Sequence, residues 1–162
     1  MTKRGKSGPR KLASGDVATN RQARFKYELL ERWEAGIALE GSEVKSLRAG
    51  KANLKDAYAT VRDGQVWLHG VHIAPYGPAA SDGHDPERPR KLLLHRNEIE
   101  RLIGKTHEKG LTLIPTRMYF SGSRAKVEIA LARGKEVRDK REAIRAREQR
   151  REIERELKQR SR

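Results

Sequence analysis

The sequence predicts a mainly β protein with some α-helix: an OB-like closed antiparallel barrel with flanking helices, followed by a basic tail that is disordered when free. Three observations lead to this fold class. Strand-forming runs in the middle of the chain are separated by turn sequences, two short helical patterns interrupt the strands, and positive charge gathers at both ends. Hydrophobic residues make up only 35% of the chain, so we expect a single small core.

The charge distribution divides the 162-residue chain into three parts. Residues 1–24 carry 7 basic and 1 acidic side chains, and residues 132–162 carry 13 and 7, so each end contributes +6 to a net charge of +15. We therefore expect a disordered basic arm at 1–19, a barrel domain at 20–131 and a basic tail at 132–162. Such a field attracts polyanions, and nucleic acid is the first candidate partner.

Two hairpins are predicted in the middle of the chain. In "AYATVRDGQVWLHGVHI", Asp63-Gly64 supplies the positive φ angles of a tight turn between two β-rich runs. In the second, "LTLIPTRMYF" and "AKVEIALA" flank "SGSR", and alternating apolar residues give one inward face. Pro115 predicts a bend or an edge position, and Gly36 predicts a kink or bulge in a long strand over "YELLERWEAGIALEG".

Two helices are predicted between the strands. In "HRNEIERLIGKTHEKG", the apolar residues Ile99, Leu102 and Ile103 share one face, with Asn97 as the N-cap and Gly104 ending the first turns. The shorter "GSEVKSLRAG" has Ser42 as its predicted N-cap, Gly50 as its stop, and Val44 and Leu47 facing inward.

Several classes of function find little support in the residues. The chain has no cysteine, no apolar run long enough for a bilayer and no phosphate-binding loop, because the lysines of "GKT" and "AGKAN" lack the required upstream glycine. His69 and His72 point to opposite faces of a strand, and no grouped carboxylates suggest a catalytic metal. We expect a cytoplasmic monomer that is no enzyme and needs no metal or cofactor.

Three basic clusters supply the positive evidence for RNA. Each combines cations for phosphates with an amide or a ring for a base or a 2′-hydroxyl. The clusters are Asn20, Arg21 and Arg24; Lys45, Arg48, Lys51 and Asn53; and Arg88, Arg90, Lys91 and His95.

Four ordered stretches of this sequence resemble the SmpB family, the small protein B that binds transfer-messenger RNA (SsrA) in bacterial ribosome rescue. They are "NRQARFKY", "EAGIALEGSEVKSLRAGKANLKDAYA", "HDPERPRKLLLH" and "GKEVRDKR". The resemblance runs from about Asn20 to the end. It implies an OB-like barrel and a non-catalytic adaptor that holds the tRNA-like part of that RNA. It also implies entry into stalled ribosomes with elongation factor Tu and GTP, the tail probing the empty messenger channel beside the small-subunit decoding region.

The resemblance also implies individual site residues. It places RNA contacts at Asn20, Arg21, Glu34, Lys45, Arg48 and Leu93, and tail contacts with the ribosome at Gly134, Lys135, Asp139, Lys140 and Arg141. The chain has Glu136 where the family usually has a second lysine, so the first tail contact depends on Lys135. Two other readings stay open: a general RNA chaperone or ribosome-associated basic protein, and an RNA-processing enzyme.

Overall fold

The computed structural model describes residues 15–77, 83–108 and 110–160, excluding the side chains of residues 137–139 and 160. Most of the predicted N-terminal arm, residues 1–14, lies outside these ranges. The elements in chain order are β1 (Asp16–Thr19), α1 (Ala23–Lys26), β2 (Tyr27–Ile37), α2 (Gly41–Arg48), β3 (Ala52–Asn53), β4 (Tyr58–Arg62), β5 (Gln65–His69), β6 (His72–Ile73), β7 (Arg90–Leu93), α3 (Arg96–Thr106), β8 (Leu111–Ser121), β9 (Arg124–Gly134) and α4 (Val137–Arg160).

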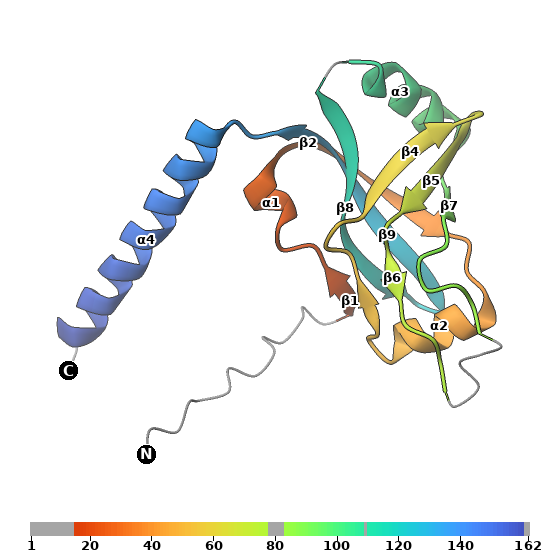
Figure 1. Cartoon of the computed structure of the whole chain (residues 1–162), viewed down its shortest axis with the longest axis horizontal. Helices are drawn as coiled ribbons and strands as arrows, with labels where there is room; N and C mark the ends of the chain where they lie inside the picture. The colour runs from red at the N-terminus through yellow and green to blue at the C-terminus, as the bar shows by residue number, and fades with distance from the viewer. Residues whose placement is uncertain (1–14, 78–82, 109, 161–162) are drawn as a thin grey trace.

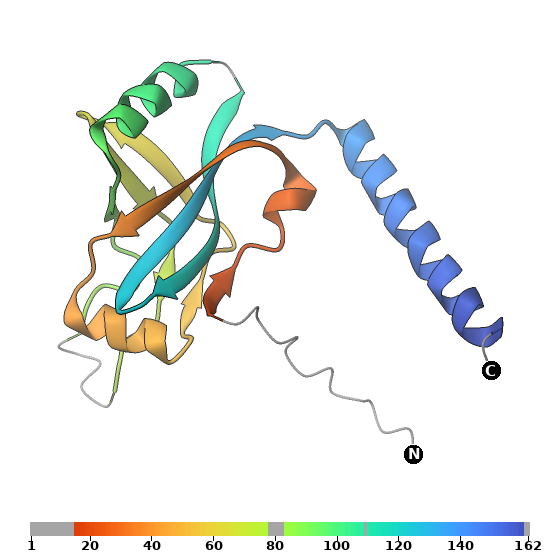
Figure 2. The ribbon, with the colours of Figure 1, turned by 180° about the vertical axis from the view of Figure 1, so that it is seen from behind.

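A closed ring of antiparallel strands forms the body of the molecule. The ring runs β8-β4-β5-β7-β2-β9 and returns to β8, and β1 adds to the outer side of β8. Strands β3 and β6 pair separately as a short ladder. Figure 1 shows the ring with helices outside it, and Figure 2 shows β2 and β9 running together across the back. The predicted OB-like barrel is confirmed.

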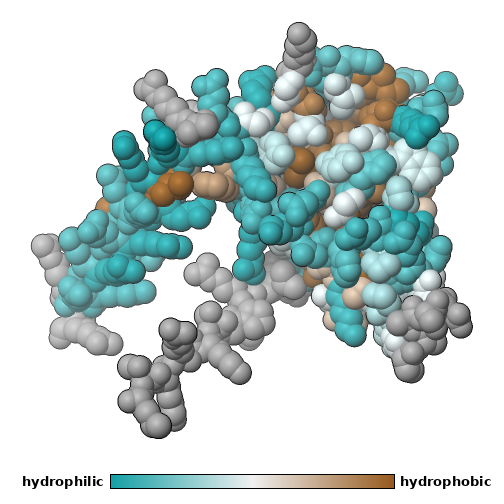
Figure 3. Space-filling view, in the orientation of Figure 1, coloured by the Kyte–Doolittle hydropathy of each residue, from teal (hydrophilic) through white to brown (hydrophobic). Residues whose placement is uncertain are grey.

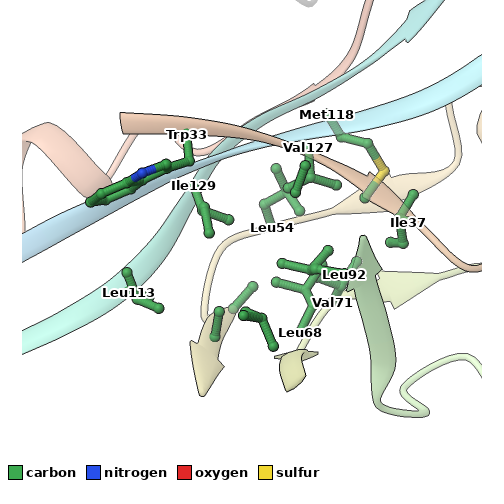
Figure 4. Packing of buried hydrophobic residues seen from close by; sticks show 14 of the residues in the cluster. Trp33, Ile37, Leu54, Leu68, Val71, Leu92, Leu113, Met118, Val127 and Ile129 are labelled. Carbon is green, nitrogen blue, oxygen red and sulfur yellow. The ribbon is translucent and has the colours of Figure 1, made fainter. Parts of the chain in front are cut away.

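The barrel interior is filled by side chains that alternate inward along each strand. On β9, Val127, Ile129 and Leu131 are buried while Lys126 and Glu128 are only partly covered, as the alternating pattern predicts. Figure 4 shows one continuous core, in which the labelled residues from β2, β5, β7, β8 and β9 meet: Trp33, Ile37, Leu68, Leu92, Leu113, Met118, Val127 and Ile129.

Both predicted hairpins are present. Asp63 and Gly64 have φ angles of 52° and 69°, the left-handed values that a two-residue turn between β4 and β5 requires. Strands β8 and β9 pair from Leu111 to Arg133, and the register shifts between Pro115 and Arg117. The proline therefore lies at an irregularity of the ladder, as predicted, where its missing N–H costs little.

The bulge expected at Gly36 is at a different position. In β2 the register shifts between Leu29 and Glu31, whereas Gly36 pairs regularly with both Lys126 and Leu93. A Cβ atom at Gly36 would lie 3.2 Å from the Cβ of Leu93. The glycine thus permits close approach of β7, which is a second reason for glycine in a strand.

The helices α2 and α3 lie at opposite ends of the barrel in Figure 1. Both start two residues earlier than predicted: Glu40 and His95 are the N-caps, each completing a capping box with the glutamate three residues later. Helix α3 continues through Gly104 to Thr106. Leu47 and Leu102 are buried as predicted, and they anchor the two helices to the core.

Strand β1 corrects the boundary of the N-terminal arm. Residues 16–19, expected to be disordered, pair with β8 along Arg117–Tyr119, because β4 pairs with β8 only at Leu113 and leaves the edge of β8 beyond it free for a further strand. The short helix α1, which the sequence analysis missed, follows.

The tail forms a single 24-residue helix, α4, that projects away from the barrel (Figures 1 and 2). The guanidinium of Arg147 in α4 lies 5.7 Å from the ring centre of Phe25 in α1. That the tail lacks fixed structure in the free protein stays a prediction. Within residues 15–77, 83–108 and 110–160, none of the helices combines the length and apolar character needed to cross a membrane.

Candidate nucleic-acid interface

The first predicted cluster lies in a basic groove beside β1 and α1. Arg21 and Arg24 are exposed there, and the strands add Arg32 and Arg117, which the sequence analysis did not single out. The groove encloses about 540 Å³. It is lined by Asp16, Thr19, Asn20, Arg21, Ala23, Arg24, Leu29, Arg32, Thr116, Arg117 and Glu128, and we call it the arginine groove.

Asn20 lines this groove and is only 7% exposed. Its backbone N–H donates to the Thr116 carbonyl at 2.7 Å, and its Nδ2 donates to the Pro115 carbonyl at 3.1 Å. Both bonds reach the irregular part of β8, where ladder partners are missing. The predicted RNA residue Asn20 is therefore also a structural residue.

Glu34 lies on the outward face formed by β2, β8 and β9, which carries Arg32, Glu34, Arg117, Tyr119, Lys126 and Glu128 and which we call the three-strand face. The Tyr119 hydroxyl donates to Glu34, and Lys126 Nζ lies 3.7 Å from its Oε1. Partial burial and the hydrogen bond to the carboxylate raise the pKa of Tyr119 to about 12. The tyrosine thus stays a hydrogen-bond donor at neutral pH.

Glu128 pairs directly across the ladder from Glu34, an arrangement that would repel without counter-charges. Arg32 and Arg117 each lie 3.3 Å from its carboxylate, and the Thr116 hydroxyl donates to Oε1 at 2.6 Å. Burial alone would raise the pKa of Glu128, but Thr116 and Arg117 outweigh it and hold the pKa below its usual value. Glu128 therefore stays ionised at neutral pH, and it orients Arg32 and Arg117 around it.

Glu34 and Leu93 line one hollow of about 740 Å³ at the other side of the three-strand face, together with His95, Arg124 and Lys126. The resemblance had named the first two residues separately, and the pairing of β2 with β7 brings them together. Leu93 is 51% exposed, so it offers an apolar surface at the rim of the hollow.

The second cluster lies on and after α2. Lys45 and Arg48 are exposed, and each cation lies over an aromatic ring, Lys45 at 5.7 Å from the centre of Tyr76 and Arg48 at 5.0 Å from that of Phe120. Lys51 and Asn53 are also exposed, but the Asn53 side-chain oxygen accepts from the Lys55 N–H at 2.9 Å. The lysines and the arginine are thus presented to solvent, while the asparagine carbonyl is used locally.

The expected contact at Arg90 conflicts with the structure. Arg90 is 0% exposed; its Nε lies 2.7 Å from Oε1 of buried Glu43, and its Nη1 donates to the Val71 carbonyl at 2.9 Å. Arg88 also binds Glu43, at 2.6 Å. Inward alternation in β7 buries this arginine, so it joins α2 to the barrel and has no access to RNA; Lys91, the next residue, remains partly exposed.

The tail residues start at the end of β9. Gly134 pairs with Tyr27, and Lys135 Nζ donates to the Arg24 carbonyl at 2.9 Å. The first residues of the tail therefore contact α1 beside the arginine groove. Lys140 is partly buried and Arg141 exposed, whereas the side chain of Asp139 lies outside the described residues. In Figure 3 most side chains visible on the tail helix are hydrophilic, with a small hydrophobic spot among them, and Ile144, Ile153 and Leu157 are exposed on the helix.

The described residues include no group of three or more potential metal ligands. His69 bonds to the Thr60 hydroxyl and stacks on Tyr58, and His84 bonds to Ser42 and to the Ile73 carbonyl. The contacts of His69 and His84 thus hold strands and loops of the barrel together.

Sequence reasoning missed the residues that frame Glu34, namely Arg32, Arg117, Tyr119, Lys126 and Glu128. The signal was present as strand alternation: positions 32 and 34, 117 and 119, and 126 and 128 each point to the same face. Combining them required the pairing of three strands, which spacing within one strand does not provide.

A family model described as "SmpB protein" matches residues 17–159. An "SsrA-binding protein" of Sulfurihydrogenibium sp. (strain YO3AOP1) is 57% identical over 142 residues, covering 88% of this chain and 93% of the relative. Another "SsrA-binding protein", of Synechococcus sp. (strain JA-3-3Ab), is 58% identical over 143 residues, with the same shares covered.

A solved structure shares this fold. The chain aligns with it at a TM-score of 0.65 and 50% identity, over 78% of this chain and 93% of the other. That structure is described as "tmRNA-SmpB: a journey to the center of the bacterial ribosome".

Proposed function

The chain belongs to the SmpB family and binds transfer-messenger RNA in trans-translation, and we propose that it does so as a non-catalytic adaptor working in two parts. The barrel holds the tRNA-like domain of that RNA, and the tail tests whether the messenger channel of a stalled ribosome is empty. The protein acts as a monomer in the cytoplasm, and elongation factor Tu with GTP joins through the RNA.

One observation supports the assignment of the RNA to the barrel: exposed and partly exposed cations surround two carboxylates over a continuous surface. The arginine groove contributes Arg21, Arg24, Arg32 and Arg117, and the three-strand face continues from it through Glu128 to Glu34 and Lys126. Cations bind phosphates irrespective of sequence, whereas a fixed carboxylate accepts hydrogen bonds from base amino groups or 2′-hydroxyls. Such a surface suits a folded RNA with exposed base edges.

The tail supports the second part of the proposal by its charge and its few contacts with the barrel. It is a long, highly basic helix that buries little against its own domain, and it starts beside the arginine groove. A groove walled by RNA phosphates would neutralise its cations and supply the free energy for ordering.

A general RNA chaperone shares the charge and the barrel but requires no selectivity for a tRNA-like fold. An RNA-processing enzyme would convert its substrate at catalytic amounts. Turnover measured with purified protein and RNA distinguishes the enzyme, and competition between RNAs distinguishes the chaperone.

The experiment is a gel shift with transfer-messenger RNA, a tRNA of ordinary length and an unrelated hairpin. Wild-type protein should prefer transfer-messenger RNA, and Glu34→Ala should weaken that complex by about 1–3 kcal/mol. Glu100→Ala, on the exposed side of α3, is the matched control and should bind as wild type. Glu34 is a cleaner target than Asn20, whose bonds to β8 also stabilise the fold. Equal binding of all three RNAs, or an unaffected Glu34→Ala variant, would overturn the proposal.

A further inference from the structure

We propose that a second hollow, on the other side of Asn20 from the arginine groove, receives one unpaired RNA base that carries an exocyclic amino group. It encloses about 260 Å³ between the segment Asn20–Gln22, α1, the start of β4 and β8, and we call it the base pocket. This inference rests on the proposed function and adds to it a site and a preferred class of base.

Two unpaired acceptors point to a ligand that donates hydrogen bonds. Within the described residues, the Asn20 Oδ1 and Gln22 Oε1 atoms are the buried side-chain polar atoms without a hydrogen-bond partner. Both side chains line the base pocket. A buried acceptor without a partner is costly, and each such atom in a folded protein requires an explanation.

The local hydrogen bonds fix the orientation of Asn20. The Pro115 carbonyl needs a donor, and the Asn20 amide nitrogen supplies it at 3.1 Å, so Oδ1 must face away from β8. The Gln22 residue caps α1 through its backbone carbonyl, which accepts from Phe25 and Lys26, while its side chain makes no capping bond. Neither side-chain oxygen is needed to hold the helix.

The rim of the pocket has the other features that a nucleotide requires. Lys26 and Lys55 line it and are exposed, which outweighs the single carboxylate of Asp56. Tyr58 is 45% exposed and stacks on His69 with ring centres 5.2 Å apart, so its ring is held in place at the rim. A fixed aromatic ring beside cations is the usual platform for an unstacked base.

Size and continuity select a single base over larger ligands. The volume is below the roughly 300–1,000 Å³ of pockets that enclose drug-sized ligands. The pocket shares Asn20 with the arginine groove, so an RNA strand whose phosphates follow Arg21 and Arg24 passes the opening. An amino group has two hydrogens for the two acceptors, whereas the carbonyl of uracil at the corresponding position would repel them.

The test compares cytidine and uridine hexanucleotides, whose bases differ by an amino group in place of a carbonyl at C4 and by N3, which accepts in cytosine and carries an N–H in uracil. Full-length protein at one fixed salt concentration should bind the cytidine oligomer about five- to tenfold more tightly. Gln22→Met, which keeps the length of the side chain but removes the acceptor, should remove most of that preference. Tyr58→Ala should weaken both complexes about tenfold.

The matched control is Gln65→Met on the exposed β4–β5 hairpin, which should keep the preference. Gln22→Met should leave the thermal midpoint of the free protein unchanged or higher, because it removes an unpaired acceptor. Equal binding of the two oligomers by wild-type protein, or a preference that survives Gln22→Met, overturns the base pocket. Failure to prefer transfer-messenger RNA over tRNA overturns the proposed function instead, so the two failures are distinguishable.

Discussion

Glu43 is the fully buried carboxylate that joins α2 to the barrel. Its carboxylate accepts hydrogen bonds from the guanidinium groups of Arg88 and Arg90. It also accepts one from the backbone N–H of Glu40, at 2.8 Å. Burial alone would raise the pKa of Glu43, but the bonds from Arg88, Glu40 and Arg90 outweigh burial and lower the pKa below its usual value. The position of Lys45 and Arg48 on α2 depends on this ion pair.

Glu43→Gln should destabilise the protein by about 3–5 kcal/mol at neutral pH, because Arg90 would remain buried without its counter-charge. A carboxyl whose pKa is lowered by folding contributes stability above its unfolded pKa and loses it as pH falls through the folded value. Wild-type stability should therefore decline as the pH falls below about 4.3, the pKa of an unfolded glutamate, and the variant should lack this part of the decline. Urea denaturation at stepped pH measures both effects. Glu40→Gln is the control, because Glu40 is exposed and its carboxylate lies 3.7 Å from Arg88. Equal losses of stability from the two variants would refute the role of Glu43.

Residue identities alone predicted the exposed cations better than the buried ones. Lys45, Arg48 and Arg21 are exposed as expected, because neighbouring apolar residues indicate which side of the element faces inward. Arg90 has a sequence context as basic as theirs, and only its partner Glu43, 47 residues away, makes burial possible. A pairing over that distance leaves no local pattern.

Helix α2 presents its cations at one end of the barrel as a unit. Arg48 lies over Phe120 of β8, next in sequence to Tyr119 of the three-strand face, so a phosphate bound by α2 would lie close to that face. The helix was predicted from its apolar spacing, but its start was not, because Glu40 at the N-cap is a less common capping residue than Ser42.

Lys45→Ala and Arg48→Ala should each reduce the salt dependence of transfer-messenger RNA binding by about one unit of slope, the value for one lost phosphate contact. Affinity measured at several salt concentrations gives the slope. Arg62→Ala, an exposed cation at the β4–β5 turn, should leave it unchanged. Unaltered slopes for both α2 variants would move the phosphate path to another surface.

The whole molecule consists of a closed barrel and an extended basic helix. The hairpins and the alternating core positions were predictable because their signals are local, as Asp63-Gly64 and Val127–Leu131 illustrate. The closure of the ring, the added strand β1 and the grouping of Glu34 with Tyr119 depend on pairings between distant segments. The sequence therefore predicted the type of fold and the exposure of several cations, but not how the candidate site is assembled.

One paired assay tests whether the barrel binds the RNA independently of the tail. Protein truncated before Arg138 keeps the complete barrel, and the triple change of Asp139, Lys140 and Arg141 to Ala keeps the tail length. Both variants should bind transfer-messenger RNA within about twofold of wild type, because the proposed RNA surfaces lie on the barrel. Both should fail to support tagging of peptides on ribosomes that lack message. Tagging by the truncated protein, or a parallel loss of RNA binding, would contradict the division of labour between barrel and tail.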